Sequence, residues 1–352
     1  MSFLKTKKVL HHPEKISEWY NTGDTAAPVT VKIDLTNVCN HNCPGCIDYE
    51  LIANDNNSLD LNRLCGVLDD FKELDVKAVN YTGGGEPTVH KDFADIIRET
   101  HRRGIQIGLI CNGSRFHKLP MEEILKMFTW IRVSMDSFSP ETHIRTHGST
   151  AKYDLTIDNL EYLVSIKREQ NLNVTLGAGY ITHQHADMDN ECWRFIKQCK
   201  DVGLDYAQLR PSFGVLYDYD IMSFEEWEKI ISRVKKYEDD KFSVYINEGK
   251  YKKIFSKNTC RNYDTCHAQA FKSTTITATG QVYMCCSLTS DPRGYIGNIK
   301  KRSFKEIWQG DIRKKALERL NVHKCPSLCV GDSLNEFLEQ FKNQEIMHKN
   351  FL

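Results

Sequence analysis

Residues 34–50 read DLTNVCNHNCPGCIDYE, and this stretch places Cys39, Cys43 and Cys46 within one short segment. The spacing C-x3-C-x2-C follows an apolar run at residues 31–35 that predicts a β-strand. A loop of this length can wrap three thiolates around one corner of a small iron–sulfur cube, which leaves one of the four irons without a protein ligand. Because an open coordination position distinguishes a reactive metal site from a structural one, the segment predicts a reactive iron–sulfur centre.

The competing interpretation of the same loop is a structural zinc site with His41 as the fourth ligand. Structural zinc sites usually pair a C-x2-C element with a second, distant pair, and this loop requires none. The loop follows the first predicted strand, at the end of a β/α barrel that normally carries the chemistry. This position favours the iron–sulfur interpretation.

A second motif, YTGGGEPTVH at residues 81–90, follows the next predicted strand. The consecutive glycines Gly83, Gly84 and Gly85 allow a backbone to approach a ligand closely. Glu86 can accept hydrogen bonds from an ammonium group. Together with the cysteine loop, this motif predicts a site for a small charged cofactor.

Short apolar runs alternate with amphipathic stretches of helical length through the first two thirds of the chain. The predicted strands are residues 31–35, 78–81, 106–111, 131–136, 173–179 and 206–210, and the predicted helices are residues 60–74, 91–103, 121–128, 156–170 and 189–202. Helix-length crossovers require a parallel sheet. The fold class is therefore α/β, and six such units predict a partial (β/α)6 TIM-like barrel, although a doubly wound sheet would give a similar alternation.

The composition argues against several partners. The 352 residues carry 47 basic and 47 acidic side chains, so nothing favours a nucleic acid or an anionic membrane. No apolar run approaches the length of a membrane span, and the N-terminus lacks the apolar core of a secretory signal. We therefore expect a cytoplasmic protein, in which the clustered ones among its 13 cysteines bind metal rather than form disulfides.

With both motifs described, residues 30–210 resemble the radical S-adenosylmethionine superfamily. The resemblance implies that the open iron binds the cofactor's methionine part, and that reductive cleavage yields a 5′-deoxyadenosyl radical that abstracts hydrogen from a substrate. It implies Cys39, Cys43 and Cys46 as cluster ligands. It also implies cofactor contacts from Gly84, Gly85, Glu86, Asn112, Ser134, Arg145 and Tyr180. Many members carry an aromatic residue where this chain has Gly45, so the adenine contacts are expected elsewhere.

A second group of cysteines lies near the C-terminus. Cys266 is followed by thirteen residues, Gly280, four residues and Cys285, a spacing that resembles the opening of a SPASM/twitch auxiliary-cluster domain. Gly280 suits a hairpin turn between two short strands. Cys325 and Cys329 supply a further pair. The resemblance implies the shorter twitch form, an α+β domain in which these four cysteines hold one auxiliary [4Fe–4S] cluster.

Two further cysteines leave alternatives open. Cys260 could replace Cys266 as a ligand, and four cysteines in two pairs could also hold zinc. Cys286 is adjacent to a predicted ligand, and neighbouring residues of a strand face opposite ways. It is either a hydrogen donor to a substrate radical or a small buried residue.

We expect three parts: an N-terminal lead at residues 1–28, a radical SAM partial barrel at residues 29–240, and a twitch/SPASM-like domain with a C-terminal helix at residues 241–352. The expected function is abstraction of hydrogen from a small polar substrate, a sugar, cyclitol or nucleotide-like molecule, giving dehydrogenation or epimerisation with help from the auxiliary cluster. Candidate substrate contacts at the strand ends are Tyr180, His183, His185, Gln208 and Arg210.

Two alternatives remain open. One is maturation of a ribosomal peptide by epimerisation or crosslinking, although such enzymes often carry a peptide-recognition domain ahead of the barrel and the short lead leaves no room for one. The other is a non-catalytic zinc protein that binds a partner. The resemblance implies flavodoxin or ferredoxin as the electron donor.

Overall fold

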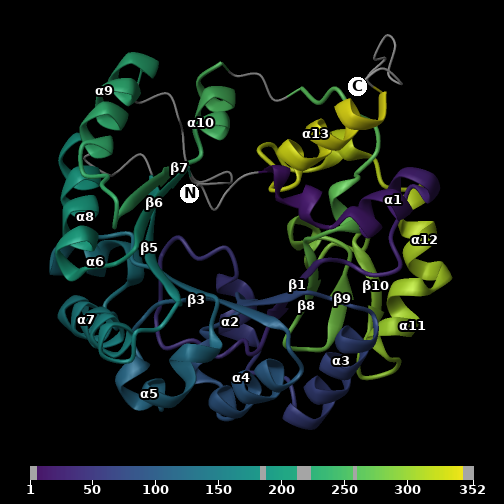
Figure 1. The fold of residues 1–352 in the computed structure, drawn as a ribbon, viewed down its shortest axis with the longest axis horizontal. Coiled ribbons are helices and arrows are strands. Elements are labelled where there is room, and N and C mark those ends of the chain that lie inside the picture. The colour runs from purple at the N-terminus through teal and green to yellow at the C-terminus, as the bar shows by residue number, and fades with distance from the viewer. Residues whose placement is uncertain (1–5, 183–187, 212–222, 257–259, 344–352) are drawn as a thin grey trace.

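The computed structural model describes residues 6–182, 188–211, 223–256 and 260–343 (Figure 1). Within these residues one ten-stranded sheet has the order β10-β9-β8-β1-β2-β3-β4-β5-β6-β7. The strands are β1 (Thr30–Asp34), β2 (Ala78–Thr82), β3 (Gln106–Cys111), β4 (Trp130–Ser134), β5 (Thr175–Thr182), β6 (Tyr206–Pro211), β7 (Ser243–Ile246), β8 (Thr274–Ile276), β9 (Gln281–Tyr283) and β10 (Tyr295–Asn298).

Helices fill most of the connections between these strands. The α-helices of the described residues are α1 (Pro13–Thr22), α2 (Tyr49–Asn54), α3 (Leu61–Glu73), α4 (Phe93–Arg102), α5 (Met121–Ile124), α6 (Pro140–His147), α7 (Tyr153–Glu169), α8 (Met188–Val202), α9 (Phe224–Lys235), α10 (Glu248–Phe255), α11 (Phe304–Gln309), α12 (Asp311–Glu318) and α13 (Asp332–Asn343). The short 3₁₀ helices are η1 (Thr6–His11), η2 (Pro87–Val89), η3 (Phe116–Lys118), η4 (Leu125–Met127), η5 (Ala268–Ala270), η6 (Cys286–Leu288) and η7 (Val322–Lys324).

The predicted α/β fold with a partial barrel is confirmed. Strands β1 to β7 are parallel to their neighbours, and β7 and β10 remain the two edges, so the described sheet does not close. Figure 1 shows helices α3 to α9 along the outer side of the curved sheet. The sheet exceeds the six predicted units, because β7 continues it beyond β6 and β8 pairs in parallel with the other side of β1. Strand β7 is too short for alternation to reveal it in the sequence, whereas β8 is the first strand of the hairpin predicted around Gly280.

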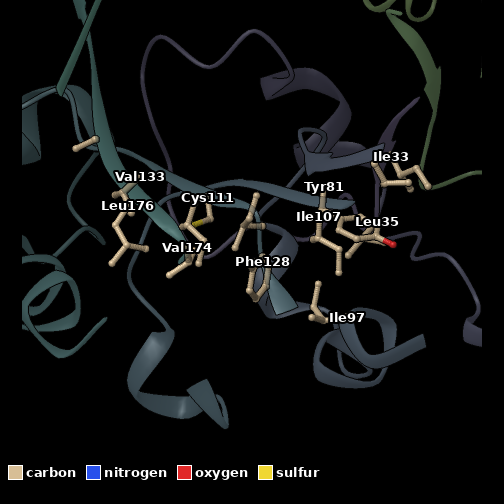
Figure 2. Packing of buried hydrophobic residues seen from close by; sticks show 14 of the residues in the cluster. Ile33, Leu35, Tyr81, Ile97, Ile107, Cys111, Phe128, Val133, Val174 and Leu176 are labelled. Carbon is tan, nitrogen blue, oxygen red and sulfur yellow. The ribbon is translucent and has the colours of Figure 1, made fainter. Parts of the chain in front are cut away.

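Each parallel strand presents apolar side chains to the helices and polar ones to the inner face. On β1, Val31 and Ile33 are buried in the main core, whereas Lys32 and Asp34 alternate with them on the inner face. Side chains from all parts of the sheet join this core (Figure 2). The inner face is therefore free to carry polar groups, which is where a site can form.

Helix α4 shows why the crossovers pack as they do. Its buried residues, Phe93, Ile96, Ile97 and Thr100, recur at the spacing of one helical face. Figure 2 shows Ile97 beside the side chains of the strands it covers. The predicted helix at residues 91–103 is thus observed within two residues at its N-terminal end and one at its C-terminal end.

The C-terminal part begins with a hairpin. Strand β9 is antiparallel both to β8 and to β10. Gly280 adopts a φ of +83° at the turn, a conformation that glycine adopts without strain, as expected from the sequence. Helix α13 follows the last cysteines, and the remainder of the predicted C-terminal helix, residues 344–352, lies outside the described residues.

The N-terminal lead packs against the C-terminal part of the chain rather than lying apart from it. Trp19 belongs to a second, smaller core with Phe271 and Leu338. The Arg313 guanidinium forms an ion pair with Asp24. The division of the chain into domains at residues 28 and 240 stays a prediction.

None of the helices in the described part of the chain combines the length and apolar character that crossing a membrane requires.

Candidate active site

The cysteine loop leaves the C-terminal end of β1 and places its three thiols close together. Cys39, Cys43 and Cys46 are each partly buried, and the backbone N–H of Cys46 donates to the carbonyl of Cys43 at 3.2 Å. Burial, followed by the negative charges of Cys39 and Cys46 as thiolates, raises the pKa of the Cys43 thiol to about 12. Three adjacent thiolates are therefore unfavourable in the chain alone, and a bound cation would stabilise them.

The glycine motif positions this loop. The N–H of Gly85 donates to the carbonyl of Thr36 at 2.7 Å, and the N–H of Glu86 donates to the carbonyl of Val38 at 2.9 Å. A Cβ atom at Gly85 would lie 2.0 Å from the Val38 carbonyl oxygen. Gly84 has a φ of +67°, a conformation in which other residues are strained. The close backbone approach expected of these glycines is thus made, in this structure, to the residues just before Cys39.

Glu86 is almost fully buried, and burial raises its pKa. One carboxylate oxygen accepts from the N–H of Thr88 at 3.0 Å, and the other accepts from the N–H of Asn112 at 2.7 Å. These bonds join the end of β2 to the end of β3. The Thr88 hydroxyl also donates to the first oxygen at 2.5 Å, so only the oxygen bonded to Asn112 keeps a lone pair. Contact with an ammonium group stays a prediction that this second oxygen permits.

Asn112 connects the third strand to the cysteine loop. Its amide nitrogen donates to Asn40 Oδ1 at 2.9 Å, and its amide oxygen accepts from the N–H of Ser114 at 3.0 Å. The Asn40 amide in turn donates to the Ser114 hydroxyl at 2.7 Å. The predicted cofactor residue therefore lies in a polar network that begins one position after Cys39.

Arg145 and Tyr180 meet on a carboxylate that the sequence did not identify. The Arg145 guanidinium donates to both carboxylate oxygens of Glu191 at 2.8 Å, and the Tyr180 hydroxyl donates to the same group at 2.5 Å. The Tyr180 ring packs against Phe195 of α8. Its side chain thus lies on the helix side of β5, so a contact with adenine would come from its backbone. Ser134, by contrast, lies on the inner face of β4.

Two histidines, His41 and His147, lie beside Cys43 of the cysteine loop. His41, Cys43 and His147 place one ligand atom each within 4.8 Å of one another, a grouping that could hold a metal ion. However, the two ring nitrogens of His147 contact the Cys43 sulfur at 3.3 Å and the Met135 carbonyl at 2.9 Å. This arrangement leaves Cys39 and Cys46 outside the group, so it uses only part of the available thiols. The three-cysteine donor set fits an iron–sulfur cluster better.

The C-terminal cysteines also come together. Cys266 lies close enough to Cys325 and Cys329 for their negative charges to raise its pKa. The thiol of Cys285 donates toward Cys329. The Asn335 amide donates to the Cys266 sulfur at 3.7 Å, while Cys260 is exposed. Burial raises the pKa of Cys266 to about 11. These four half-buried thiols lie near one another and form a donor set that fits a fully ligated iron–sulfur cluster. They are Cys266, Cys285, Cys325 and Cys329.

Cys286 lies within this group rather than across a strand from it. Strand β9 ends at Tyr283 and Cys286 begins η6, so the alternation expected for neighbouring strand residues does not apply. Interaction with the Cys285 side chain lowers the pKa of Cys286. The positive charges of Lys32 and Lys272 act in the same direction. Whether Cys286 donates hydrogen stays a prediction.

The comparisons with known proteins place the chain in a family. The model of the radical SAM superfamily matches residues 33–190, and the model of the SPASM iron–sulfur cluster-binding domain matches residues 266–331. The two matches together span more than half of the chain. This chain is a member of the radical S-adenosylmethionine superfamily. Its cofactors are S-adenosylmethionine and [4Fe–4S] clusters, one that binds S-adenosylmethionine and one auxiliary.

The curated relatives of this radical SAM protein have diverse activities. It is 30% identical over 164 residues to an S-adenosylmethionine-dependent nucleotide dehydratase of Selenomonas ruminantium, covering 45% of this chain and 58% of that protein. It is 22% identical over 302 residues to the tungsten-containing aldehyde ferredoxin oxidoreductase cofactor-modifying protein of Pyrococcus furiosus, covering 79% of this chain and 80% of that one. The chain therefore spans little more than half the length of the dehydratase.

Among solved structures, the fold is similar to that of Streptococcus suis SuiB bound to S-adenosylmethionine. The TM-score is 0.65 at 15% sequence identity, covering 88% of this chain and 72% of SuiB. The fold is also similar to that of anSMEcpe bound to S-adenosylmethionine. The TM-score is 0.58 at 15% sequence identity, covering 83% of this chain and 83% of anSMEcpe. At this identity the similarity concerns the fold.

The family match bears on the choice between Cys260 and Cys266. The SPASM match begins at Cys266 and ends just after Cys329, so it includes the four predicted ligands and leaves Cys260 outside. This supports Cys266, although the ligand set itself stays a prediction. His183 and His185, named above as substrate contacts, lie outside the described residues.

Proposed function

We propose that this radical SAM enzyme abstracts hydrogen from a small polar substrate and completes its dehydrogenation or epimerisation with one auxiliary cluster. Cys39, Cys43 and Cys46 would hold the first [4Fe–4S] cluster, and Cys266, Cys285, Cys325 and Cys329 would hold the auxiliary one. When bound, S-adenosylmethionine and its cluster supply a 5′-deoxyadenosyl radical.

The observation that carries the proposal is the meeting of three motifs at one edge of the sheet. The cysteine loop follows β1, the glycine motif follows β2 and Asn112 follows β3, so all three stand at the C-terminal ends of parallel strands. In β/α barrels this edge carries the reactive groups. The direct hydrogen bonds from the glycine motif to the cysteine loop hold the site together in advance of any ligand.

The chain's own residues support a polar substrate. The inner face beyond the cysteine loop carries Ser134, Gln208 and Arg210, which can bind hydroxyl, carboxylate or phosphate groups. Gln208 is buried and Arg210 partly so, which strengthens their hydrogen bonds by excluding water. Relatives named as a nucleotide dehydratase and as GTP 3′,8-cyclases support a nucleotide-like substrate among the small-molecule candidates.

A peptide maturase is the second candidate. Its support is the similarity of fold to SuiB, which has been solved with its precursor peptide SuiA, and to anSMEcpe, which has been solved with a peptide. A non-catalytic zinc protein has no support from either family match. The electron donor would be a flavodoxin or ferredoxin.

Anaerobic reconstitution tests the proposed function. The reconstituted protein with dithionite and S-adenosylmethionine is expected to release 5′-deoxyadenosine, and a small-molecule substrate is expected to raise that release above the uncoupled background. A panel of nucleotides, sugar nucleotides and cyclitols is compared with a panel of short peptides. Release that peptides alone stimulate would favour the maturase, and protein that contains zinc without iron would refute both.

A further inference from the structure

Two arginines converge on the inner face of the sheet. Arg132 lies on β4 and Arg210 on β6, on either side of β5. In register, Arg132 stands opposite Gly177 and Arg210 opposite Ile181. A Cβ atom at Gly179 would lie 3.5 Å from Arg132 Cδ and 3.6 Å from a terminal nitrogen of Arg210. The two side chains therefore flank Gly179, where β5 presents no side chain of its own.

These guanidinium groups have unused donors. Arg132 donates to Gln208 Oε1 at 2.7 Å, and its Nε has no hydrogen-bond partner in the described part of the chain. The Nε of Arg210 is buried and unpartnered in the same way. A guanidinium has five N–H donors in a fixed fork, so both groups keep donors for a ligand.

Other buried arginines of this chain are neutralised by carboxylates. The side chains of Arg103, Arg261 and Arg313 are no more than 6% exposed, and each forms an ion pair with an aspartate or glutamate. Among the described residues, no carboxylate forms such a pair with Arg132 or Arg210. Arg132 and Arg210 are partly buried, and two neighbouring cations without a carboxylate partner are costly in such a position, so their presence together indicates a binding role.

The surrounding charge is positive. Burial, followed by the charge of Arg210, lowers the pKa of Arg132 to about 9. Lys250 is a further cation close enough to feel Arg210. The carboxylate of Asp136, which acts on Arg132, uses one oxygen to accept from the backbone N–H of Ile181 at 2.5 Å. An anion placed between the two arginines would relieve their mutual repulsion.

A phosphate group fits this pair better than a carboxylate does. A carboxylate has two oxygens and one charge, which a single guanidinium fork satisfies. A phosphoryl group offers three oxygens and up to two negative charges, so it can engage two forks at once. We propose that Arg132 and Arg210 bind a phosphate of the substrate, so that the substrate is a phosphorylated small molecule such as a nucleotide. This inference rests on the proposed function and names the class of its substrate.

Binding measurements test it without relying on turnover. Isothermal titration calorimetry under anoxic conditions uses the cluster-loaded protein with each ribonucleoside triphosphate, the matching unphosphorylated nucleoside, pyrophosphate, and a short peptide with a free C-terminal carboxylate. We expect wild type to bind at least one triphosphate, and Arg132→Met and Arg210→Met each to weaken that binding by about tenfold or more. Arg132→Lys retains the charge but loses the guanidinium fork. Its affinity for the triphosphate is expected to lie between those of wild type and Arg132→Met.

Two controls separate this site from the rest of the protein. Arg302→Met removes an exposed arginine and is expected to leave every affinity unchanged. S-adenosylmethionine affinity is expected to stay within about twofold of wild type in the Arg132 and Arg210 variants. Iron content and melting temperature check that each variant is folded and loaded.

Several results would overturn the inference. These are equal triphosphate binding by wild type and both methionine variants, failure of wild type to bind any phosphorylated probe, or preference for the carboxylate peptide. An equal loss of S-adenosylmethionine affinity would assign the arginines to the cofactor instead. Failure of wild type to cleave S-adenosylmethionine would refute the proposed function, and the binding data would still decide whether the arginines hold phosphate.

Discussion

Substituting Gly85 with alanine tests how the glycine motif shapes the first cluster site. The added Cβ atom would lie 2.0 Å from the carbonyl oxygen of Val38, 2.5 Å from its carbonyl carbon and 2.7 Å from the carbonyl carbon of Asn37. All three are backbone atoms, which cannot rotate away as a side chain could. The two backbones would have to separate by roughly 1.5 Å before ordinary contact distances return.

That separation breaks two hydrogen bonds. The Gly85-to-Thr36 bond of 2.7 Å and the Glu86-to-Val38 bond of 2.9 Å would stretch beyond the usual limit. Each bond contributes about 1 kcal/mol, and overpacking adds about 1–3 kcal/mol. The local free-energy cost is therefore about 3–5 kcal/mol. The chain can avoid this cost by moving the segment that leads to Cys39, and that movement would change the geometry of the three thiols.

We therefore expect Gly85→Ala to lose the first cluster while keeping the auxiliary one. Iron content after anoxic reconstitution should fall from about eight to about four atoms per chain, and the change that S-adenosylmethionine makes in the electron paramagnetic resonance spectrum should disappear. Gly66→Ala is the matched control, because its Cβ atom would meet nothing within 4 Å on α3 and alanine favours a helix. Full iron content with an intact S-adenosylmethionine response in Gly85→Ala would refute this reasoning.

Three further predictions concern the cysteines and their charges. Replacing Cys39, Cys43 and Cys46 together with alanine should abolish release of 5′-deoxyadenosine while auxiliary-cluster absorbance remains, and continued release would show that the first cluster lies elsewhere. Cys286→Ala should spare a dehydrogenase but stop an epimerase before hydrogen return, which product analysis in deuterium oxide distinguishes; retained deuterium incorporation at the reacting carbon would remove Cys286 from the mechanism. Lys272 is half-buried and its positive charge lies close to the auxiliary cysteines, so Lys272→Met should lower the potential of that cluster by roughly 60 mV if the screened interaction is about 1.4 kcal/mol. Redox titration measures this shift, and an unchanged potential would contradict it.

Much of the fold could be predicted because its signals are local. The strand at residues 106–111 was expected within the bounds that β3 has, and the helix at residues 189–202 was expected one residue short of α8. Apolar alternation and helical periodicity act within a few residues of one another, so a single sequence carries them. The parallel sheet follows from the length of the crossovers.

The site was only partly predictable because its partners come from distant positions. Glu191 receives hydrogen bonds from Arg145 and Tyr180, yet its position in an amphipathic helix gives no sign of this role. Arg132 lies on β4, and for this strand the sequence predicts a cofactor contact only from Ser134. A charged residue at an inward strand position is a signal that could have found it, because such a residue must face either water or a ligand.

Strand β1 links the two cysteine sites physically. It pairs with β2, which leads to the glycine motif, and on its other side with β8, which leads through the hairpin to Cys285 and Cys286. Lys32 of this strand forms an ion pair with Asp34 at 3.2 Å and also lies close enough to lower the pKa of Cys286. Because neighbouring strands of a sheet lie about 5 Å apart, the loop with the first three cysteines and the hairpin that leads to Cys285 start from the same rigid sheet. In the proposed function, this shared strand would keep the auxiliary cluster near the first site, where it could exchange electrons with the substrate.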